Sequence, residues 1–338
     1  MGPHKTGTKS IQFFLQENRA KLLEHGYFVP ESGNNHGGHH IIVRQLCGEE
    51  VPHHHRRAAA KFIEALGDTR CEAVIISSEA LERLLRNRDY AKAFFKTVRK
   101  VNLEPKLVIF ARNQPQLINS RYVEVVKSFR RCEAFEAFVH AEIHHSTFRY
   151  SDLMALAEGF DAKLIPRPFT RETLDRGVVV DFLQTIGLDP SRFDGTNIRR
   201  NRTAGPFTVS VARDVLRLTA SLGRPLTLLQ ARRCKRKLTA YLQERGLAVT
   251  GYCGLSSGLA RQIEKEWQEP NDVFAQQIWR RPWKEVFAAD VGREFAPNDF
   301  EITEPDEHTQ RRRRQVVDEI VALTKEIMVD PMLTPESP

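Results

Sequence analysis

The first ten residues combine glycines, hydroxyl side chains and lysines directly before an apolar-periodic segment. The run from Gly2 to Ser10 reads Gly-Pro-His-Lys-Thr-Gly-Thr-Lys-Ser, and apolar residues then recur at helical spacing until about His25. Glycines let backbone N–H groups approach an anion, a helix N-terminus offers unpaired donors and positive potential, and lysine and hydroxyl groups complete the cage. The segment therefore predicts a phosphate-binding loop.

The order of these residues differs from that of the nucleoside triphosphatase loop. That loop has its lysine directly after the second glycine, whereas here Thr8 follows Gly7 and the Lys-Ser pair comes one residue late. Two apolar runs, Val74 to Ser78 and Leu107 to Ala111, also lack the terminal aspartate that a magnesium site favours. A metal-dependent triphosphatase is therefore disfavoured.

The arrangement Lys-Thr-Gly-Thr, followed by Ser-Ile-Gln and an amphipathic helix, resembles the 5′-phosphosulfate-binding loop of the sulfotransferase superfamily. In that family the lysine, here Lys5, contacts the 5′-phosphate and the oxygen that bridges it to sulfur, while loop amides and hydroxyls hold phosphate oxygens. Lys9 stands where a second Thr or Ser is common. The resemblance implies that the donor nucleotide is bound by Lys5, Thr6, Gly7, Thr8, Lys9 and Ser10.

A second, distant signature also resembles this family. The predicted strand Lys106 to Ala111 ends in Arg112-Asn113, and Ser120 lies eight residues after Arg112 on the next predicted helix. In the family, an arginine and a serine placed in this way grip the 3′-phosphate of the donor. Charge-assisted hydrogen bonds from arginine suit a phosphate dianion. The resemblance therefore implies that Arg112 and Ser120 bind this phosphate of 3′-phosphoadenosine 5′-phosphosulfate.

Further segments are similar to the same family, closest to its bacterial sulfotransferase-like group. Val74 to Glu79 resembles the strand ending in Ser-Ser-Glu, and Leu164 to Phe169 with Val179 to Leu188 resembles the strand, Arg-Pro-Phe and helix that follow. The resemblance implies an enzyme that transfers a sulfuryl group from this donor to a hydroxyl or amine. The acceptor would be a carbohydrate, a lipid or a small molecule, and no metal is expected.

Removal of the acceptor proton needs a base, and three residues are candidates. His39 and His40 follow a Gly-rich loop, and Glu79 follows the predicted strand that ends in Ser-Ser. Histidine titrates near neutrality, which suits general-base work, and related sulfotransferases use either His or Glu. Glu79 is equally compatible with a structural role at a helix first turn. Lys5 would stabilise the leaving phosphate electrostatically.

The elements that must position these residues alternate between helices and buried strands. The predicted helices cover Ser10 to His25, His39 to Gly48, Ala58 to Leu66, Glu79 to Arg86, Tyr90 to Val101, Pro115 to Phe129 and Tyr150 to Glu158. The predicted strands cover Ala73 to Ser78, Lys106 to Ala111 and Ala162 to Arg167, and Tyr27 to Pro30 is a short extended segment. This order predicts an α/β fold with a parallel sheet flanked by helices.

The resemblance implies a three-layer fold of the P-loop type with a helical C-terminal extension. A phosphate loop normally follows a buried strand, but only Met1 precedes Gly2, so we expect the first strand of the sheet to be missing. We expect residues 1–205 to form the nucleotide-binding core and residues 206–295 to form a helical part on the acceptor side of the same domain. Residues 296–338 would be a tail with a helix from Gln310 to Val329.

The chain carries a formal charge of +8 and a pI near 9.3, which favours anionic partners. An alternative is therefore a non-catalytic protein that binds nucleic acid or glycan through its basic segments, chiefly Arg199 to Arg202 and Arg232 to Lys237. A simple polyanion binder has no reason to keep two paired phosphate sites. Nucleic acid is therefore not the expected partner.

Cysteine and histidine usage favours a reduced protein without a bound metal. The five cysteines are scattered and odd in number, which is typical of reduced thiols in the cytosol. The histidines between His36 and His55 have no accompanying carboxylate spacing. No apolar run approaches the roughly 20 residues that cross a bilayer, so we expect a cytoplasmic protein without a transmembrane segment.

Overall fold

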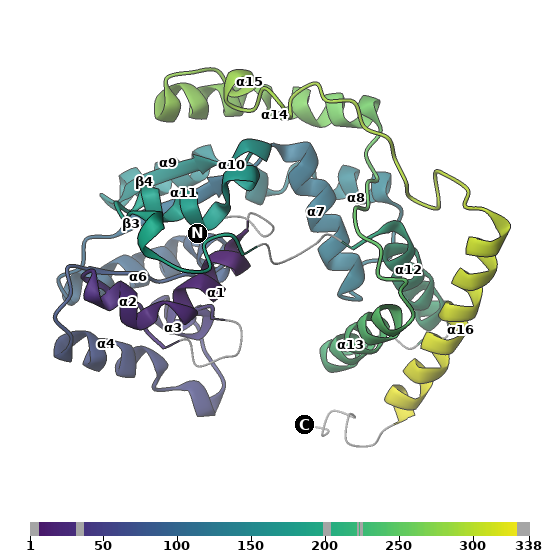
Figure 1. Ribbon diagram of the computed structural model, residues 1–338, viewed down its shortest axis with the longest axis horizontal. Coiled ribbons are helices and arrows are strands. Elements are labelled where there is room, and N and C mark those ends of the chain that lie inside the picture. The colour runs from purple at the N-terminus through teal and green to yellow at the C-terminus, as the bar shows by residue number, and fades with distance from the viewer. Residues whose placement is uncertain (1–6, 32–36, 199–203, 222, 224–225, 330–338) are drawn as a thin grey trace. The chain divides into compact units, whose positions relative to one another are not determined.

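The computed structural model describes residues 7–31, 37–198, 204–221, 223 and 226–329 (Figure 1). In these ranges the chain is mostly helical and has two parallel two-stranded sheets. It divides into two compact units, each built from three separate stretches of sequence. Unit 1 comprises Met1–Asn113, His145–Asn201 and Glu266–Val291, and unit 2 comprises Gln114–His144, Arg202–Lys265 and Gly292–Pro338. The regions predicted from the sequence, residues 1–205, 206–295 and 296–338, are each one continuous stretch, whereas each of these units combines three stretches.

One sheet of unit 1 pairs β3 (Lys106–Ala111) with β4 (Lys163–Pro168). The two strands are parallel, and Lys106 lies opposite Lys163. The ladder continues beyond the strand ends, because the Phe169 N–H donates to the Ala111 carbonyl at 2.7 Å. Both strands are therefore confirmed close to their predicted bounds.

The other sheet pairs β1 (Tyr27–Phe28) with β2 (Ala73–Val74), again in parallel. The predicted strand was longer, reaching Ser78. The pairing extends one residue further, where the Ile75 N–H donates to the Phe28 carbonyl at 2.9 Å. Past that point the chain after β1 reaches Pro30, which has no N–H to offer, and the backbone of Ser77 bonds to His39 instead.

Unit 1 also contains several α-helices in the described residues. They are α1 (Thr8–Glu17), α2 (Arg19–Glu24), α3 (His40–Leu46), α4 (Ala58–Asp68), α5 (Ala80–Leu85), α6 (Arg88–Lys100), α9 (Ser151–Gly159), α10 (Arg171–Arg176), α11 (Val178–Thr185) and α15 (Trp283–Val286). Short 3₁₀ turns lie at His53–His55, Ser146–Phe148 and Pro190–Arg192. The helix α14 (Ser257–Trp279) contributes its C-terminal part to this unit.

The single helix predicted from Ser10 to His25 is wrong, because it is two helices that meet at Asn18. The side-chain amide of Asn18 donates to the Phe14 carbonyl at 3.0 Å, and so does its backbone N–H at 3.0 Å. Asparagine competes for backbone groups in this way and disfavours a helix interior. The helical pair still ends at Gly26, whose φ of 80° is easy only for glycine.

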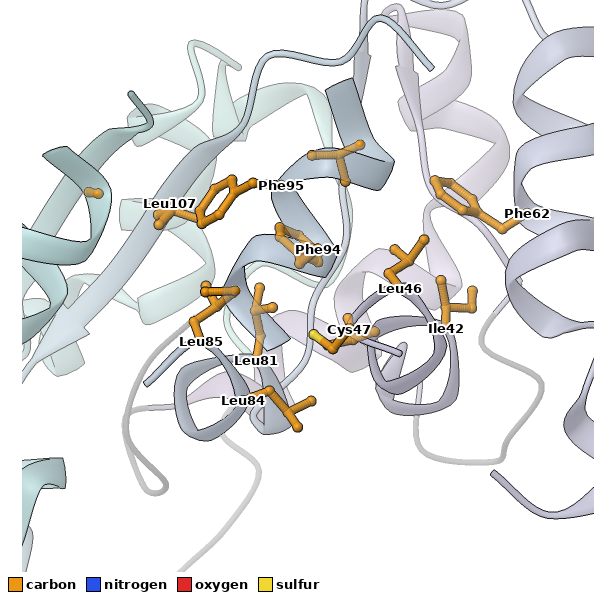
Figure 2. Packing of buried hydrophobic residues seen from close by; sticks show 14 of the residues in the cluster. Ile42, Leu46, Cys47, Phe62, Leu81, Leu84, Leu85, Phe94, Phe95 and Leu107 are labelled. Carbon is orange, nitrogen blue, oxygen red and sulfur yellow. The ribbon is translucent and has the colours of Figure 1, made fainter. Parts of the chain in front are cut away.

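The strand residues of unit 1 alternate between two apolar clusters. In the first cluster, Leu107 packs with buried side chains from α3, α4, α5 and α6, as Figure 2 shows, and Val74 packs against it. The second cluster contains Phe110 and side chains from α1 and α11, and Ile75 and Val108 pack against it. Both sheets therefore have an apolar cluster on each face.

Unit 2 is helical in the described residues. Its helices are α7 (Gln114–Lys127), α8 (Phe135–Glu142), α12 (Pro206–Ser221), α13 (Leu228–Glu244), α16 (Glu307–Val329) and the N-terminal part of α14. Arg213 on α12 is buried and forms a two-pronged ion pair with the carboxylate of Asp299. Tyr122 and Tyr252 bond to the same pair through their hydroxyls. The helix predicted near the C-terminus is confirmed as α16.

Among the described ranges, no helix has both the length and the apolar character needed to cross a bilayer.

Candidate active site

The N-terminus of α1 has the local geometry of an anion cradle. Gly7 precedes the helix with φ 76° and ψ 5°, a left-handed conformation, and its carbonyl accepts from the Ser10 N–H at 2.9 Å. A Cβ on Gly7 would lie 2.9 Å from Cγ1 of Val178, so a larger residue would be strained here and would have to displace Val178. Among the described residues no side chain caps this helix end. A helix N-terminus with its dipole, preceded by a glycine turn, suits a phosphate.

The predicted donor-binding residues differ in burial along this turn. Thr8 and Ser10 are buried, whereas Lys9 is exposed. Lys5 and Thr6 lie outside the described residues, so their predicted roles stay predictions.

Thr8 joins the start of α1 to the Ser-Ser-Glu segment. Its hydroxyl donates a hydrogen bond to Oε1 of Glu79, 71 positions further along the chain. Glu79 immediately precedes α5 and follows the extended stretch that continues β2. The structure thus brings together two segments that the sequence placed in one site only through the family resemblance.

His39 is fully buried and uses both ring nitrogens on the backbone. Nδ1 lies 2.9 Å from the backbone nitrogen of Ser77, and Nε2 lies 2.9 Å from the carbonyl oxygen of Pro30. Since Ser77 N–H donates to Nδ1, the proton of the neutral ring belongs on Nε2. Burial is the main cause that lowers the pKa of His39 to about 4, while its backbone hydrogen bonds oppose that shift. This geometry favours a structural role, in which His39 ties the ends of β1 and β2 together.

His40 lies beside the serine pair that precedes Glu79. Its Nδ1 is 2.9 Å from Oγ of Ser78, and the same hydroxyl accepts from the Ala80 N–H at 3.2 Å. The ring is half-buried, and a Cβ on Gly38 would lie 2.6 Å from Nε2. His40 is therefore held at the same turn as Glu79.

Arg112 follows the last residue of β3, and a single tyrosine holds its backbone. The Arg112 N–H donates to the hydroxyl of Tyr150 at 2.9 Å, and that hydroxyl donates to the Arg112 carbonyl at 2.8 Å. The guanidinium carbon lies 5.6 Å from the ring centre of Phe169. Burial is the main cause that lowers the pKa of Arg112 to about 10, and the negative charge of Asp290 opposes that shift.

Arg112 and the start of α1 share their packing partners within unit 1. Phe169, under the guanidinium, belongs to the same apolar cluster as Ile11 of α1 and as Val178, which packs on Gly7. The two predicted phosphate contacts of this unit therefore rest on one cluster. Ser120 is buried on α7 and belongs to unit 2, so its predicted partnership with Arg112 stays a prediction.

The Arg-Pro-Phe segment is fixed by a buried carboxylate. Nε and Nη2 of Arg167 lie 3.0 and 2.7 Å from the two oxygens of Asp181, which is buried on α11. A two-pronged pair of this kind fixes direction as well as distance. It anchors α11, and with it Val178 beneath Gly7, to the end of β4.

Sequence reasoning missed two residues of this site. Tyr150 was predicted only as the start of a helix, and no local pattern could link it to a residue 38 positions away. Gln12 is buried, and among the described residues its Nε2 has no hydrogen-bond partner. It could have been noticed, because it lies four residues after Thr8 and therefore on the same helix face.

In the described part of the chain, no cluster of histidine, cysteine and carboxylate side chains is arranged to hold a metal ion. Comparison of the whole chain with models of known protein families, with curated proteins and with solved structures found no match.

Proposed function

We propose that this chain is a sulfotransferase. It would move a sulfuryl group from 3′-phosphoadenosine 5′-phosphosulfate to a hydroxyl or amine of a carbohydrate, a lipid or a small molecule. The observation that carries the proposal is the hydrogen bond from Thr8 to Glu79. It joins a helix N-terminus suited to a phosphate with a carboxylate suited to removing a proton. Sulfuryl transfer needs both close together, because the phosphate carries the sulfuryl group and the acceptor that loses the proton attacks its sulfur.

The reaction requires one bond to form as another breaks. A base takes the acceptor proton while the acceptor oxygen or nitrogen bonds to sulfur. The bond from sulfur to the bridging oxygen breaks, the electron pair stays on that oxygen, and 3′,5′-adenosine bisphosphate leaves. In the family that the chain resembles, a lysine that corresponds to Lys5 contacts this oxygen. Positive charge there lowers the barrier most effectively, because negative charge develops on that oxygen.

Glu79 is the base that the geometry supports best. Both nitrogens of His39 are engaged by the backbone, and its lowered pKa makes it a weak base. Glu79 contacts Thr8, one residue after the glycine that opens the phosphate cradle. His40 is the second candidate, since it stands at the same turn through Ser78.

The proposed core is a three-layer fold of the P-loop type. Apolar clusters on both faces of both small sheets support it, because parallel sheets in such folds are covered on both sides. A further parallel strand between the two sheets would complete the layer. The proposal includes a cytoplasmic location, which the five free cysteines favour.

Calorimetry with 3′,5′-adenosine bisphosphate and 5′-AMP tests the proposal. The bisphosphate should bind at least about tenfold more tightly, since only it carries the phosphate assigned to Arg112. Arg112→Gln should abolish this preference. Arg70→Gln is the matched control, because Arg70 is an exposed arginine of the same unit. Equal affinity of the two nucleotides for the wild-type protein would refute the proposed function.

Polyanion binding is a second candidate, and one observation favours it. The helices α13 and α16 pack together in unit 2 (Figure 1) and both carry exposed cations. These are Arg232, Arg236, Lys237, Arg311, Arg312 and Arg314. A pure polyanion binder would bind a sulfated polysaccharide with a steep loss of affinity in salt, and it would not distinguish the two nucleotides.

A further inference from the structure

Arg112 directly follows β3, at the point where the pairing with β4 ends. Its backbone groups bond to the side chain of Tyr150 instead of to a neighbouring strand. The last ladder bond runs from the Phe169 N–H to the Ala111 carbonyl at 2.7 Å. At the next residue, the N–H and the carbonyl of Arg112 both bond to the hydroxyl of Tyr150, at 2.9 and 2.8 Å. One phenol therefore fixes both backbone groups of this arginine.

Tyr150 is itself held rigidly. Only 2% of its surface is exposed, and its ring stacks on Trp283 with centroids 5.7 Å apart and planes 25° apart. Burial raises the pKa of Tyr150, so the hydroxyl keeps the proton that it donates. The indole N–H of Trp283 in turn donates to Oδ1 of Asn113 at 3.0 Å. The pair Arg112-Asn113 is thus held by two stacked rings.

The arginine side chain then has little freedom left. Its guanidinium lies over the ring of Phe169, and the carboxylate of Asp290 is close enough to act on its charge. With its backbone held by Tyr150 and its guanidinium over Phe169, the side chain has few conformations left. A fork of fixed donors recognises a phosphate better than a mobile one, because less entropy is lost on binding.

We propose that Tyr150 is the positioning residue that gives the donor site its preference for a 3′-phosphorylated nucleotide. This inference rests on the proposed function, and it adds a residue that the sequence did not single out. Tyr150 would itself touch no substrate. It acts through the backbone of Arg112.

The test is the ratio of two dissociation constants, for 5′-AMP and for 3′,5′-adenosine bisphosphate. Tyr150→Phe keeps the ring stack and removes both hydrogen bonds to Arg112. It should lower this ratio about tenfold and change the 5′-AMP affinity by less than about twofold. Tyr27→Phe is the matched control, because the Tyr27 hydroxyl also donates to a backbone carbonyl of unit 1, that of Ile186, at 2.6 Å. The control should lower the melting temperature and leave the ratio unchanged.

The possible outcomes separate the two proposals. If the wild-type protein does not prefer the bisphosphate, the proposed function fails and the inference falls with it. If the wild-type protein does prefer it, an unchanged ratio in folded Tyr150→Phe overturns the inference alone, and so does an equal loss of affinity for both nucleotides. Should Tyr150→Phe not fold in plain buffer, the ratio is measured for it and for the wild-type protein in concentrated sucrose, which favours the folded state. The same fall in ratio is expected there, and an unchanged ratio again overturns the inference.

Discussion

The hydroxyl of Thr8 and the carboxylate of Glu79 are joined by a hydrogen bond across 71 positions of sequence. A threonine hydroxyl has one proton to donate. A phosphate oxygen at the start of α1 would therefore compete with Glu79 for it. In the proposed function, nucleotide binding would therefore release the Glu79 carboxylate from this hydrogen bond.

Glu79→Gln should separate catalysis from donor binding. The amide keeps the size of the side chain but cannot take a proton, so kcat should fall by about 10²- to 10⁴-fold. The affinity for 3′,5′-adenosine bisphosphate should change only about threefold, since the amide oxygen of glutamine can still accept from the Thr8 hydroxyl. Turnover of labelled donor and calorimetry measure the two quantities.

His40→Gln is the comparison for this prediction. It should keep most of the turnover if Glu79 is the base, because the carboxylate stays in place and His40 contributes a hydrogen bond to Ser78. Normal turnover in Glu79→Gln with a large loss in His40→Gln would transfer the role to His40.

Gly7→Ala should weaken nucleotide binding and destabilise the protein by about 1–2 kcal/mol. The left-handed φ of 76° is unfavourable for alanine, and the new Cβ would press on Val178 at 2.9 Å. The unfolding free energy in urea measures the change. Gly67→Ala is the control, because Gly67 lies inside α4 with open space around it, and alanine there should stabilise the helix. A Gly7→Ala protein as stable as wild type would show that this turn is not constrained as described.

The burial of His39 predicts a pH-dependent contribution to stability. Its pKa is lowered from the ordinary 6.5 to about 4, so the unfolded chain takes up the proton first as the pH falls. The contribution is complete above about pH 6.5 and is lost progressively down to about pH 4, by about 3 kcal/mol. His39→Gln should be less stable than wild type at neutral pH. The difference between their free energies of unfolding should narrow by about 3 kcal/mol at low pH.

Urea unfolding at the two pH values checks this expectation. His54→Gln serves as the control because His54 is exposed. Its free energy of unfolding should match that of the wild-type protein at both pH values. A gap of constant size in His39→Gln would mean that His39 is not the group that titrates.

The strands and most helices of unit 1 could be predicted because their signals are local. The apolar run Lys106–Ala111 is a strand with the same bounds that its pattern indicated, and Gly26 ends the first helical pair as expected. The strand predicted to reach Ser78 ended early, since its pairing depends on Pro30 and His39, which lie far away in sequence.

The candidate site was less accessible to sequence reasoning. The types of Thr8, Glu79 and Arg112 indicated phosphate and proton chemistry, but only the fold brings Thr8 to Glu79. The hydroxyl of Tyr150 has no pattern around it that would suggest two bonds to one distant backbone residue. Such support depends on tertiary packing, which periodicity does not encode.

An added strand should strengthen the core of unit 1. Both sheets carry apolar clusters on both faces, yet among the described residues each sheet has only two strands, a size that is marginal by itself. In the proposed three-layer fold, a run of about six β-branched apolar residues fused before Met1 would pair between them. The midpoint and the slope of urea unfolding should both rise, because more surface is exposed on unfolding.

The control for this fusion is the same extension with proline at its centre. Proline cannot donate to a ladder and is excluded from central strands. Equal stability of the two fusions would argue against a strand position between the sheets.

The aromatic side chains that stack on Tyr150 come from the third stretch of unit 1. Trp283 and Phe274 belong to Glu266–Val291, and the centre of each ring lies 5.7 Å from that of Tyr150. A fragment that ends at residue 205 would lack these aromatic side chains. It would leave an apolar surface exposed to water behind the proposed donor site. A minimal catalytic piece that omits Glu266–Val291 would therefore be prone to aggregate during preparation for crystallisation.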